Sequence, residues 1–241
     1  MYDDLLLEVR RPAQYLGGEW NVSNKDFDNA SIKFALSFPD LYEIGMSNLG
    51  LRIIYGLLNS FPDVVCERFF AVDSDLERLL RLQKREILSL ESRKRLIEFD
   101  LAGFSLGSEL GYTNVLNILD LANFPLKASL RDHTYPLVIG GGPCVLNPEP
   151  MHDFFDFFVI GEAEDLIREV LDTYRKYKKA YKSGRMEKTE LLSVLSNLEG
   201  VYVSCLYEVI YSTEGKIKEF RAKRKDAPLK IKKRFVKDLD S

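Results

Sequence analysis

The chain has 241 residues, of which 46% are hydrophobic, and a formal net charge of −3. This size and composition predict a packed core in one domain with appendages, or in two small domains. The N-terminus lacks the pattern of a signal peptide, no run of about 18 apolar residues could span a membrane, and three widely spaced cysteines argue against a disulfide framework or a compact metal cluster. We therefore expect a cytoplasmic protein with reduced thiols and no membrane partner.

Short apolar segments alternate with segments of helical periodicity from residue 31 onward. Strands are predicted at 32–37, 64–72, 100–106, 136–139 and 154–160, and helices at 46–59, 75–98, 110–122 and 161–181. Short apolar strands separated by helices are typical of a parallel sheet that is covered on both faces. The sequence therefore predicts a doubly wound α/β fold with right-handed crossovers.

The character of the sequence changes after Gly184. A short helix is predicted at 187–197, followed by a long strand at 200–211, a turn, and a second strand at 216–223. Gly215 supplies the positive φ of this turn, so the pattern predicts a β-hairpin. The expected organisation is an N-terminal segment at 1–30, the α/β domain at 31–184, a helix-plus-hairpin extension at 185–223 and a basic linker at 224–241.

Positive charge is concentrated near the C-terminus. Residues 216–237 hold eleven Lys or Arg against two acidic residues, which leaves 23 basic and 35 acidic residues, a net charge of −12, in the remainder. One interpretation is a solvated linker or a face that docks on an acidic neighbour. The other is nucleic-acid binding, which is less favoured because Phe220 and Phe235 are the stretch's only aromatic residues for base stacking.

Four loops rich in glycine and small polar residues follow predicted strands. They are residues 39–47, 105–111, 140–147 and 161–165. Because the loops after parallel strands share one edge of the sheet, we expect these four segments to converge around a ligand crevice.

Individual residues of these loops have alternative roles. Gly45 allows close approach of a ligand, and Ser47 either caps the first helix or donates a hydrogen bond to a ligand. Ser105 offers a hydroxyl group after the third strand. Gly140, Gly141 and Gly142 either expose bare backbone to a flat ligand or form a tight exit from the fourth strand.

The acidic and catalytic candidates are weaker. Glu162 and Glu164 lie in a first helical turn, where carboxylates suit the helix dipole, so capping is favoured over catalysis. Tyr42 is either a half-packed residue of the loop or a neighbour of a cofactor's reactive face. No nucleophile–base pair, paired-histidine spacing or phosphate-binding loop is present, so no catalytic or metal-binding residue is predicted.

The first loop contains Asp40-x-Tyr42-x-x-Gly45, which resembles the Asp-x-His-x-x-Gly signature of cobalamin-binding domains. More broadly, the sequence resembles the N-terminal cobalamin-binding-like domain of radical S-adenosylmethionine (SAM) proteins, and in particular an uncharacterised radical SAM fusion family. The resemblance runs from about residue 10 to the end and rests on these strings: YLGGE at 15–19, FPDLYEIGMSNLGL at 38–51, FDLAGFSL at 99–106, YTNVLNILDL at 112–121, GGGPCVLNPEP at 140–150, IGEAE at 160–164 and GVYVSCLY at 200–207.

This resemblance implies a flavodoxin-like doubly wound sheet of strand order 2-1-3-4-5, here with a C-terminal hairpin extension, that precedes a barrel-type catalytic domain. It also implies cobalamin as a possible cofactor. The residues that it assigns to cofactor binding are Asp40, Tyr42 and Gly45 in the first motif, Ser105 and Leu106 near the second, and Gly140 and Gly141 in the third. Ser47, Gly142 and Glu162 lie beside these positions and complete the candidate set.

Two departures from the family pattern shape the expected function. Tyr42 replaces the histidine, so no protein nitrogen can ligate cobalt from that position. The Cys-x-x-x-Cys-x-x-Cys motif is absent, so we expect the iron–sulfur cluster and S-adenosylmethionine to be held by a catalytic domain outside this chain, in cis or in trans. The basic residues 224–241 would lead toward that domain.

The leading hypothesis is therefore an accessory cobalamin-binding-like domain of a radical SAM protein that is not an enzyme on its own. The alternative is a nucleic-acid or protein docking module that uses the basic C-terminal stretch. A stand-alone hydrolase or transferase using Asp40, Glu43 and Ser105 is a third interpretation, but it lacks an evident base.

Overall fold

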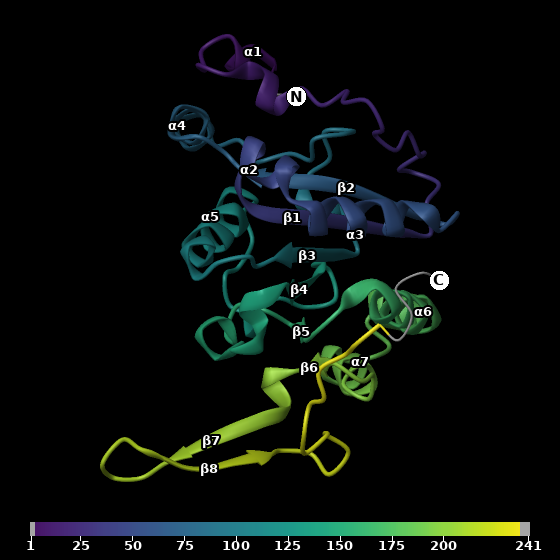
Figure 1. Cartoon of the computed structure of the whole chain (residues 1–241), viewed down its shortest axis with the longest axis vertical. Coiled ribbons are helices and arrows are strands. Elements are labelled where there is room, and N and C mark those ends of the chain that lie inside the picture. Colours follow the sequence, from purple (N-terminus) through teal and green to yellow (C-terminus); the bar gives the residue numbers. More distant parts are fainter. Residues whose placement is uncertain (1–2, 237–241) are drawn as a thin grey trace.

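The computed structural model describes residues 3–236, which form an α/β fold around one six-stranded sheet (Figure 1). The order of its strands is β2-β1-β3-β4-β5-β6. The first five strands are parallel, and β6 joins β5 in the antiparallel direction. The predicted fold class and the order 2-1-3-4-5 are confirmed, with β6 as an additional edge strand. The strands are β1 (Ile32–Leu41), β2 (Val64–Ala71), β3 (Leu101–Ser105), β4 (Leu137–Gly141), β5 (Phe157–Val159) and β6 (Val201–Tyr202).

Helices cover the sheet on both faces. Helix α3 packs beside α6, and α4 packs beside α5. The α-helices are α1 (Asp3–Leu6), α2 (Tyr42–Ser47), α3 (Leu49–Ser60), α4 (Ser74–Gln83), α5 (Tyr112–Leu121), α6 (Ala163–Lys182) and α7 (Lys188–Leu195). Short 3-10 helices fill the connections: η1 (Pro12–Tyr15), η2 (Leu96–Glu98), η3 (Glu109–Gly111), η4 (Ala128–Leu130), η5 (Pro143–Leu146), η6 (Glu149–Met151) and η7 (Ser204–Leu206). Among residues 3–236, no helix is both long and apolar enough to cross a membrane.

Strand β2 lies at the edge of the sheet, yet all eight of its residues are buried. The Asn59 side chain donates to the backbone oxygen of Cys66 at 3.1 Å and accepts from its N–H at 3.0 Å. Farther along, the backbone N–H of Leu90 donates to the Arg68 oxygen at 2.9 Å. These contacts occupy polar groups that an uncovered edge strand would offer to another chain.

Two predicted helices are shorter than expected. The helix expected at 46–59 is divided into α2 and α3 at Asn48, whose extended backbone lets its side chain accept from the Leu51 N–H at 2.9 Å. Asn48 therefore caps α3, and Ser47 instead donates to the Ile44 oxygen at 2.8 Å. The helix expected at 75–98 ends at Gln83, because Lys84 adopts a left-handed conformation with φ of 53°.

The C-terminal hairpin is present as predicted, although the strand expected at 200–211 is interrupted. Helix η7 separates β6 from β7 (Tyr207–Tyr211), which pairs with β8 (Ile217–Ala222) in a separate two-stranded antiparallel sheet. Gly215 has the positive φ of the predicted turn, at 77°.

Residues 224–236, which were expected to form a linker, run back along the domain. Arg234 donates its N–H to the Ile160 oxygen at 2.9 Å, and its own oxygen accepts from the Glu162 N–H at 3.1 Å. Asp226 accepts from the Ser193 hydroxyl at 2.7 Å. Hydrogen bonds from Arg224 and Ser193 hold the pKa of Asp226 well below its ordinary range. Residues 237–241 of the expected linker lie outside the described residues, and the predicted domain boundaries stay predictions.

Candidate functional site

The loops after β1, β3 and β4 meet at the edge where these parallel strands end, which we call the rim. Ser105 and Gly141 are paired across β3 and β4, and the Leu106 N–H donates to the Gly141 oxygen at 2.7 Å. The Asn114 side chain donates to the Pro39 oxygen at 2.9 Å and so joins α5 to the end of β1. The structure therefore brings together three of the four loops that the sequence predicted to converge.

The fourth loop is covered by another segment. Glu162 is the residue before α6, and its carboxylate accepts a hydrogen bond from the backbone N–H of Val236. A Cβ atom on Gly161 would lie 2.2 Å from the Arg234 oxygen. The returning C-terminal segment thus occupies the surroundings of Glu162.

The rim contains a cleft of about 300 Å³ between the β1 and β3 loops. It is lined by Phe38, Pro39, Asp40, Ile44, Asn48, Gly107, Ser108, Leu110 and Gly111. The Asp40 carboxylate already accepts from the backbone N–H of Leu41 at 2.8 Å.

Large apolar side chains stand exposed in the rim loops and at the start of α3, and two of them, Ile44 and Leu110, line this cleft. The exposed fractions are 50% for Ile44, 67% for Leu49, 87% for Leu110 and 62% for Leu146. Exposed apolar residues that gather at one place mark binding surfaces more often than isolated ones do.

Tyr42 is engaged by the N-terminal segment. Its hydroxyl donates to the Glu19 carboxylate at 2.9 Å, and its ring meets the Phe70 ring edge to face at 5.7 Å between centroids. Burial, followed by the hydrogen bond to Glu19, raises the pKa of Tyr42 to about 12. Tyr42 therefore carries its proton at neutral pH, and its hydroxyl group is directed toward Glu19.

Behind Tyr42 lies a buried charge cluster. Arg68 of β2 forms ion pairs with Glu19 at 2.9 Å and with Glu91 at 2.6 Å, and its guanidinium stacks on the Tyr55 ring at 4.6 Å. The side chains of Arg68 and Glu91 are 6% and 7% exposed. This cluster was not predicted from the sequence, although the Glu67-Arg68 pair inside an otherwise apolar strand could have signalled it.

Two of the candidate glycines accommodate aromatic rings of the core. A Cβ atom on Gly45 would lie 2.2 Å from the Phe70 ring, and one on Gly140 would lie 2.5 Å from the Phe158 ring. Of the predicted glycine set at the end of β4, only Gly141 has no atom within 4 Å of its Cβ position. Gly142 has φ of 96° and packs on the backbone of Leu106, whose own side chain is buried.

These contacts allow a test of whether the residues fit cobalamin. If the cofactor is held as the sequence motif implies, two conditions must be met. The side chain at position 42 must reach into the rim, and the space beside Gly140 must be free. Tyr42 is bound to Glu19, and the rings of Phe155 and Phe158 occupy the space beside Gly140. The rim cleft is also at the lower limit of volume for a drug-sized ligand, well below that of a corrinoid with its nucleotide tail. The residues present do not fit cobalamin in this arrangement.

We expect hydroxocobalamin, titrated into the purified chain to submillimolar concentration, to leave its visible spectrum unchanged. The variant Tyr42→His should behave in the same way, because the side chain at this position is directed toward Glu19 rather than into the cleft. Hydroxocobalamin with free imidazole supplies the spectrum of nitrogen ligation for comparison. A saturable spectral change with the wild-type chain would contradict this expectation and restore the cofactor.

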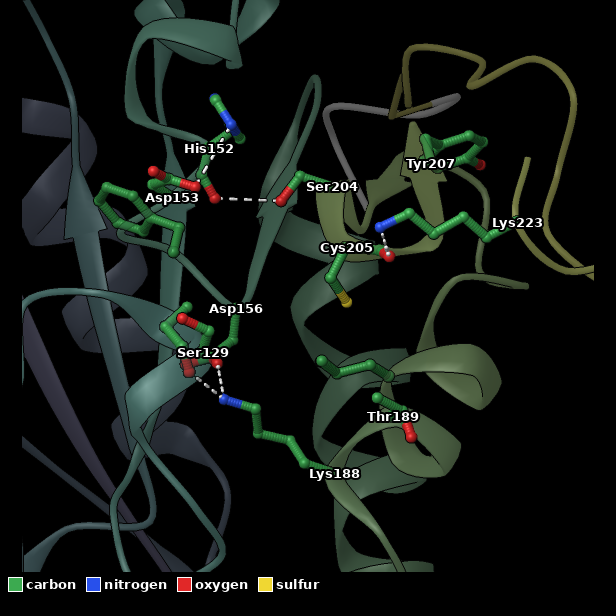
Figure 2. A pocket seen from close by; sticks show the side chains of 13 residues that line it. Ser129, His152, Asp153, Asp156, Lys188, Thr189, Ser204, Cys205, Tyr207 and Lys223 are labelled. Atoms are coloured by element: carbon green, nitrogen blue, oxygen red, sulfur yellow. Dashed lines mark hydrogen bonds and ion pairs between the residues drawn. The ribbon is translucent and has the colours of Figure 1, made fainter. Parts of the chain in front are cut away.

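A second cavity, of about 470 Å³, lies between the segment before β5 and the elements α7 and η7 (Figure 2). The Asp156 carboxylate lies on one wall of this cavity. It accepts hydrogen bonds from Lys188 Nζ at 2.7 Å and from Arg131 Nη2 at 3.2 Å. Lys223, after the end of the hairpin, donates a hydrogen bond from its Nζ to the backbone oxygen of Cys205 at 3.2 Å. No local sequence pattern predicts this cavity, because its walls come from segments spread over residues 128–223. Within residues 3–236, no group of three or more His, Cys, Asp or Glu is arranged to hold a metal ion.

Comparisons with known proteins place these features in context. The model of a family described as "Radical SAM proteins, N-terminal" matches residues 50–204, which include the ends of β3 and β4 but begin after the Asp40–Gly45 loop. An uncharacterized protein of Methanocaldococcus jannaschii is 25% identical over 141 residues, which cover 57% of this chain and 26% of that relative. The chain thus corresponds to about a quarter of the length of this curated relative. No solved structure matches.

Proposed function

Because this chain belongs to the family of N-terminal regions of radical SAM proteins, we propose that it is an accessory domain that docks on the catalytic part of such a protein through its rim. The chemistry is then divided between the two parts. The catalytic part holds the iron–sulfur cluster with three closely spaced thiolates and binds S-adenosylmethionine. The domain described here supplies a rigid surface that positions this part.

The observation that carries the proposal is the apolar surface around the rim cleft. Ile44 and Leu110 line the same cleft from α2 and η3, and both are at least half exposed. The carboxyl edge of a parallel sheet is where α/β domains bind their ligands. A cleft of about 300 Å³ with an apolar border is suited to an inserted side chain of a protein partner.

A substitution at Leu110 tests the rim as a docking surface. We expect Leu110→Asp to weaken binding to the cluster-bearing catalytic polypeptide by at least about tenfold, the loss typical of an interface hot spot. Leu110 is 87% exposed, so the substitution removes no core contact and the fold should be unaffected. Isothermal titration calorimetry measures the binding constant, and circular dichroism checks the fold.

Leu82→Asp is the matched control. Leu82 is 73% exposed in the last turn of α4, outside the rim, so its replacement should leave the affinity unchanged. Equal affinities for wild type and Leu110→Asp would exclude the rim as the docking surface. Absence of any binding by the wild-type chain would exclude the accessory role itself.

A further inference from the structure

The hairpin formed by β7 and β8 stands apart from the main sheet. It extends from the body of the domain toward the side on which β1 and β3 end (Figure 1). All residues of β8 except Ala222 are exposed. A two-stranded sheet by itself is at best marginally stable in water, so an outlying hairpin of this kind gains from a second layer packed on it.

The pairing of the two strands sorts their side chains into two faces. Tyr207 pairs with Ala222 and Val209 pairs with Phe220. The register then shifts, so that Tyr211 pairs with Ile217 and Lys218 is left as a bulge. This shift keeps Ile217 on the same side as Phe220 and makes a continuous face, which we call the hairpin apolar face: Tyr207, Val209, Tyr211, Ile217, Phe220 and Ala222.

The opposite face is different in character. Glu208 pairs with Arg221 in an ion pair of 2.5 Å, and Ile210 pairs with Glu219. Apart from Ile210, charged groups therefore dominate this opposite face, a division typical of antiparallel sheets that pack on protein with one face. The hairpin is amphipathic, but its apolar side lacks a covering layer over most of its length within the described residues.

Stacked rings join the hairpin apolar face to the core. Centroid distances are 6.2 Å from Phe158 to Tyr202, 5.5 Å from Tyr202 to Tyr207, and 5.2 Å from Tyr207 to Phe220. The stack begins on a fully buried ring and ends on Phe220, which is 50% exposed. Beyond it, Tyr211 is 59% exposed and Ile217 is 68% exposed. The base of the hairpin apolar face thus packs on the core, whereas its outer part is exposed to solvent.

The cavity of about 470 Å³ adjoins the base of this face, since Tyr207 and Lys223 line it (Figure 2). It is roomy enough for a large side chain of a partner. Beside the face, Lys218 at the bulge and Lys223 at the base add positive charge, whereas Lys216 pairs with Glu214 at 3.0 Å, so the surface has an apolar centre and a basic border. Charged borders of this kind select partners of the opposite sign.

The composition of the face favours a protein over a nucleic acid. Val209 and Ile217 are aliphatic and cannot stack with bases, whereas aromatic platforms carry single-stranded nucleic-acid binding. Tyr and Phe side chains are common at the centres of protein interfaces. The family model describes N-terminal regions of radical SAM proteins, and the matched relative is about four times as long as the aligned segment, so its remaining length offers room for such a partner surface.

We propose that the hairpin apolar face, together with the cavity at its base, binds an apolar surface with an acidic border on the catalytic part of the radical SAM protein. This inference rests on the proposed accessory function, but it concerns a surface separate from the rim. The hairpin and the rim then contact the same partner through two separate surfaces. Binding buries the outer rings of the hairpin.

A matched pair of substitutions on β8 tests the proposal. Ile217→Lys places a lysine on the hairpin apolar face and changes the charge by +1, whereas Glu219→Lys places a lysine two residues away on the opposite face and changes it by +2. We expect Ile217→Lys, and likewise Phe220→Ala, to weaken binding to the cluster-bearing polypeptide by at least about tenfold, and Glu219→Lys to leave it unchanged. The main measurement is calorimetric titration of each full-length variant of this chain, with circular dichroism as the check on folding.

The other outcomes are distinguishable. If the wild-type chain binds the catalytic polypeptide and Ile217→Lys binds equally well, the hairpin proposal is overturned while the accessory function stands. If no binding occurs at all, both fail. A wild-type dimer in light scattering that Ile217→Lys dissociates would assign the face to a second copy of the chain. Salt-sensitive binding of a labelled single-stranded RNA that Phe220→Ala abolishes would assign it to nucleic acid.

Discussion

Replacing Arg68 by methionine should lower the free energy of unfolding by about 3–5 kcal/mol, the usual cost of removing one partner from a buried ion pair. The side chains of Arg68 and Glu91 are 6% and 7% exposed, and their atoms lie 2.6 Å apart. Methionine keeps much of the volume of the arginine stem but leaves the Glu91 carboxylate without its cation. Unfolding in urea, followed by circular dichroism, measures the difference.

Two further variants identify the cause of this loss. Arg11→Met removes the ion pair between Arg11 and Glu43, whose side chains are 68% and 47% exposed, and should cost much less stability than Arg68→Met. The double variant Arg68→Met/Glu91→Gln removes the unpaired charge and should recover part of the stability. If Arg68→Met cost no more than Arg11→Met, the cluster would not be holding the N-terminal segment to β2.

An ion pair and a hydrogen bond connect this buried charge cluster to the rim. Arg68 holds Glu19, and Glu19 accepts the hydroxyl proton of Tyr42 at the start of α2. Ile44 of the same helix lines the rim cleft. A buried charge in β2 therefore fixes the position of a helix that forms part of the proposed docking surface.

The parallel sheet followed from the sequence because each of its strands is a short apolar run between helical segments, whereas the strand order 2-1-3-4-5 was implied by the family resemblance. Such runs must be buried on both faces, and only a few topologies achieve this. The predicted end of the helix at 75–98 was wrong for a physical reason. Its apolar period ends near Leu82, and the charged residues that follow cross the edge of β2 instead of continuing the helix.

The rim was predicted in its location but not in its detail. Loops after parallel strands must share an edge, so the loops at 39–47, 105–111, 140–147 and 161–165 were expected to converge. The role of Gly140 depends on Phe158 of the adjacent strand β5, a packing contact that the local sequence does not encode. The covering of Glu162 by Arg234 and Val236 likewise joins segments more than 70 residues apart.

The cavity at the base of the hairpin could not have been predicted for the same reason. Its walls come from η4, the segment before β5, α7 and η7, and none of these carries a recognisable motif. The clearest local clue is Asp156, an acidic residue directly before a strand of apolar residues. Its partners, Arg131 and Lys188, lie 25 and 32 residues away.

The second large effect is expected at this carboxylate. Asp156→Ala should destabilise the fold by about 3–5 kcal/mol, because it leaves the Arg131 guanidinium buried without an anion. The side chains of Arg131 and Asp156 are 0% and 1% exposed, and Asp156 also accepts from the Val138 N–H at 2.7 Å. Asp156→Asn retains hydrogen-bonding groups of similar shape and should lose less. Urea unfolding of the three proteins gives the order of stability.

Asp153→Ala provides the control from the same cavity. Asp153 is 51% exposed and pairs with Lys127 at 3.3 Å, so its removal should cost no more than about 1 kcal/mol. If the two alanine variants lost equal stability, the walls of the cavity would not depend on the buried ion pair. A large loss confined to Asp156 would instead show that one carboxylate fixes β5 against α7, because Lys188 of that helix donates to it at 2.7 Å. The cavity beside the hairpin would then have a rigid wall before any partner arrives, which lowers the entropic cost of docking.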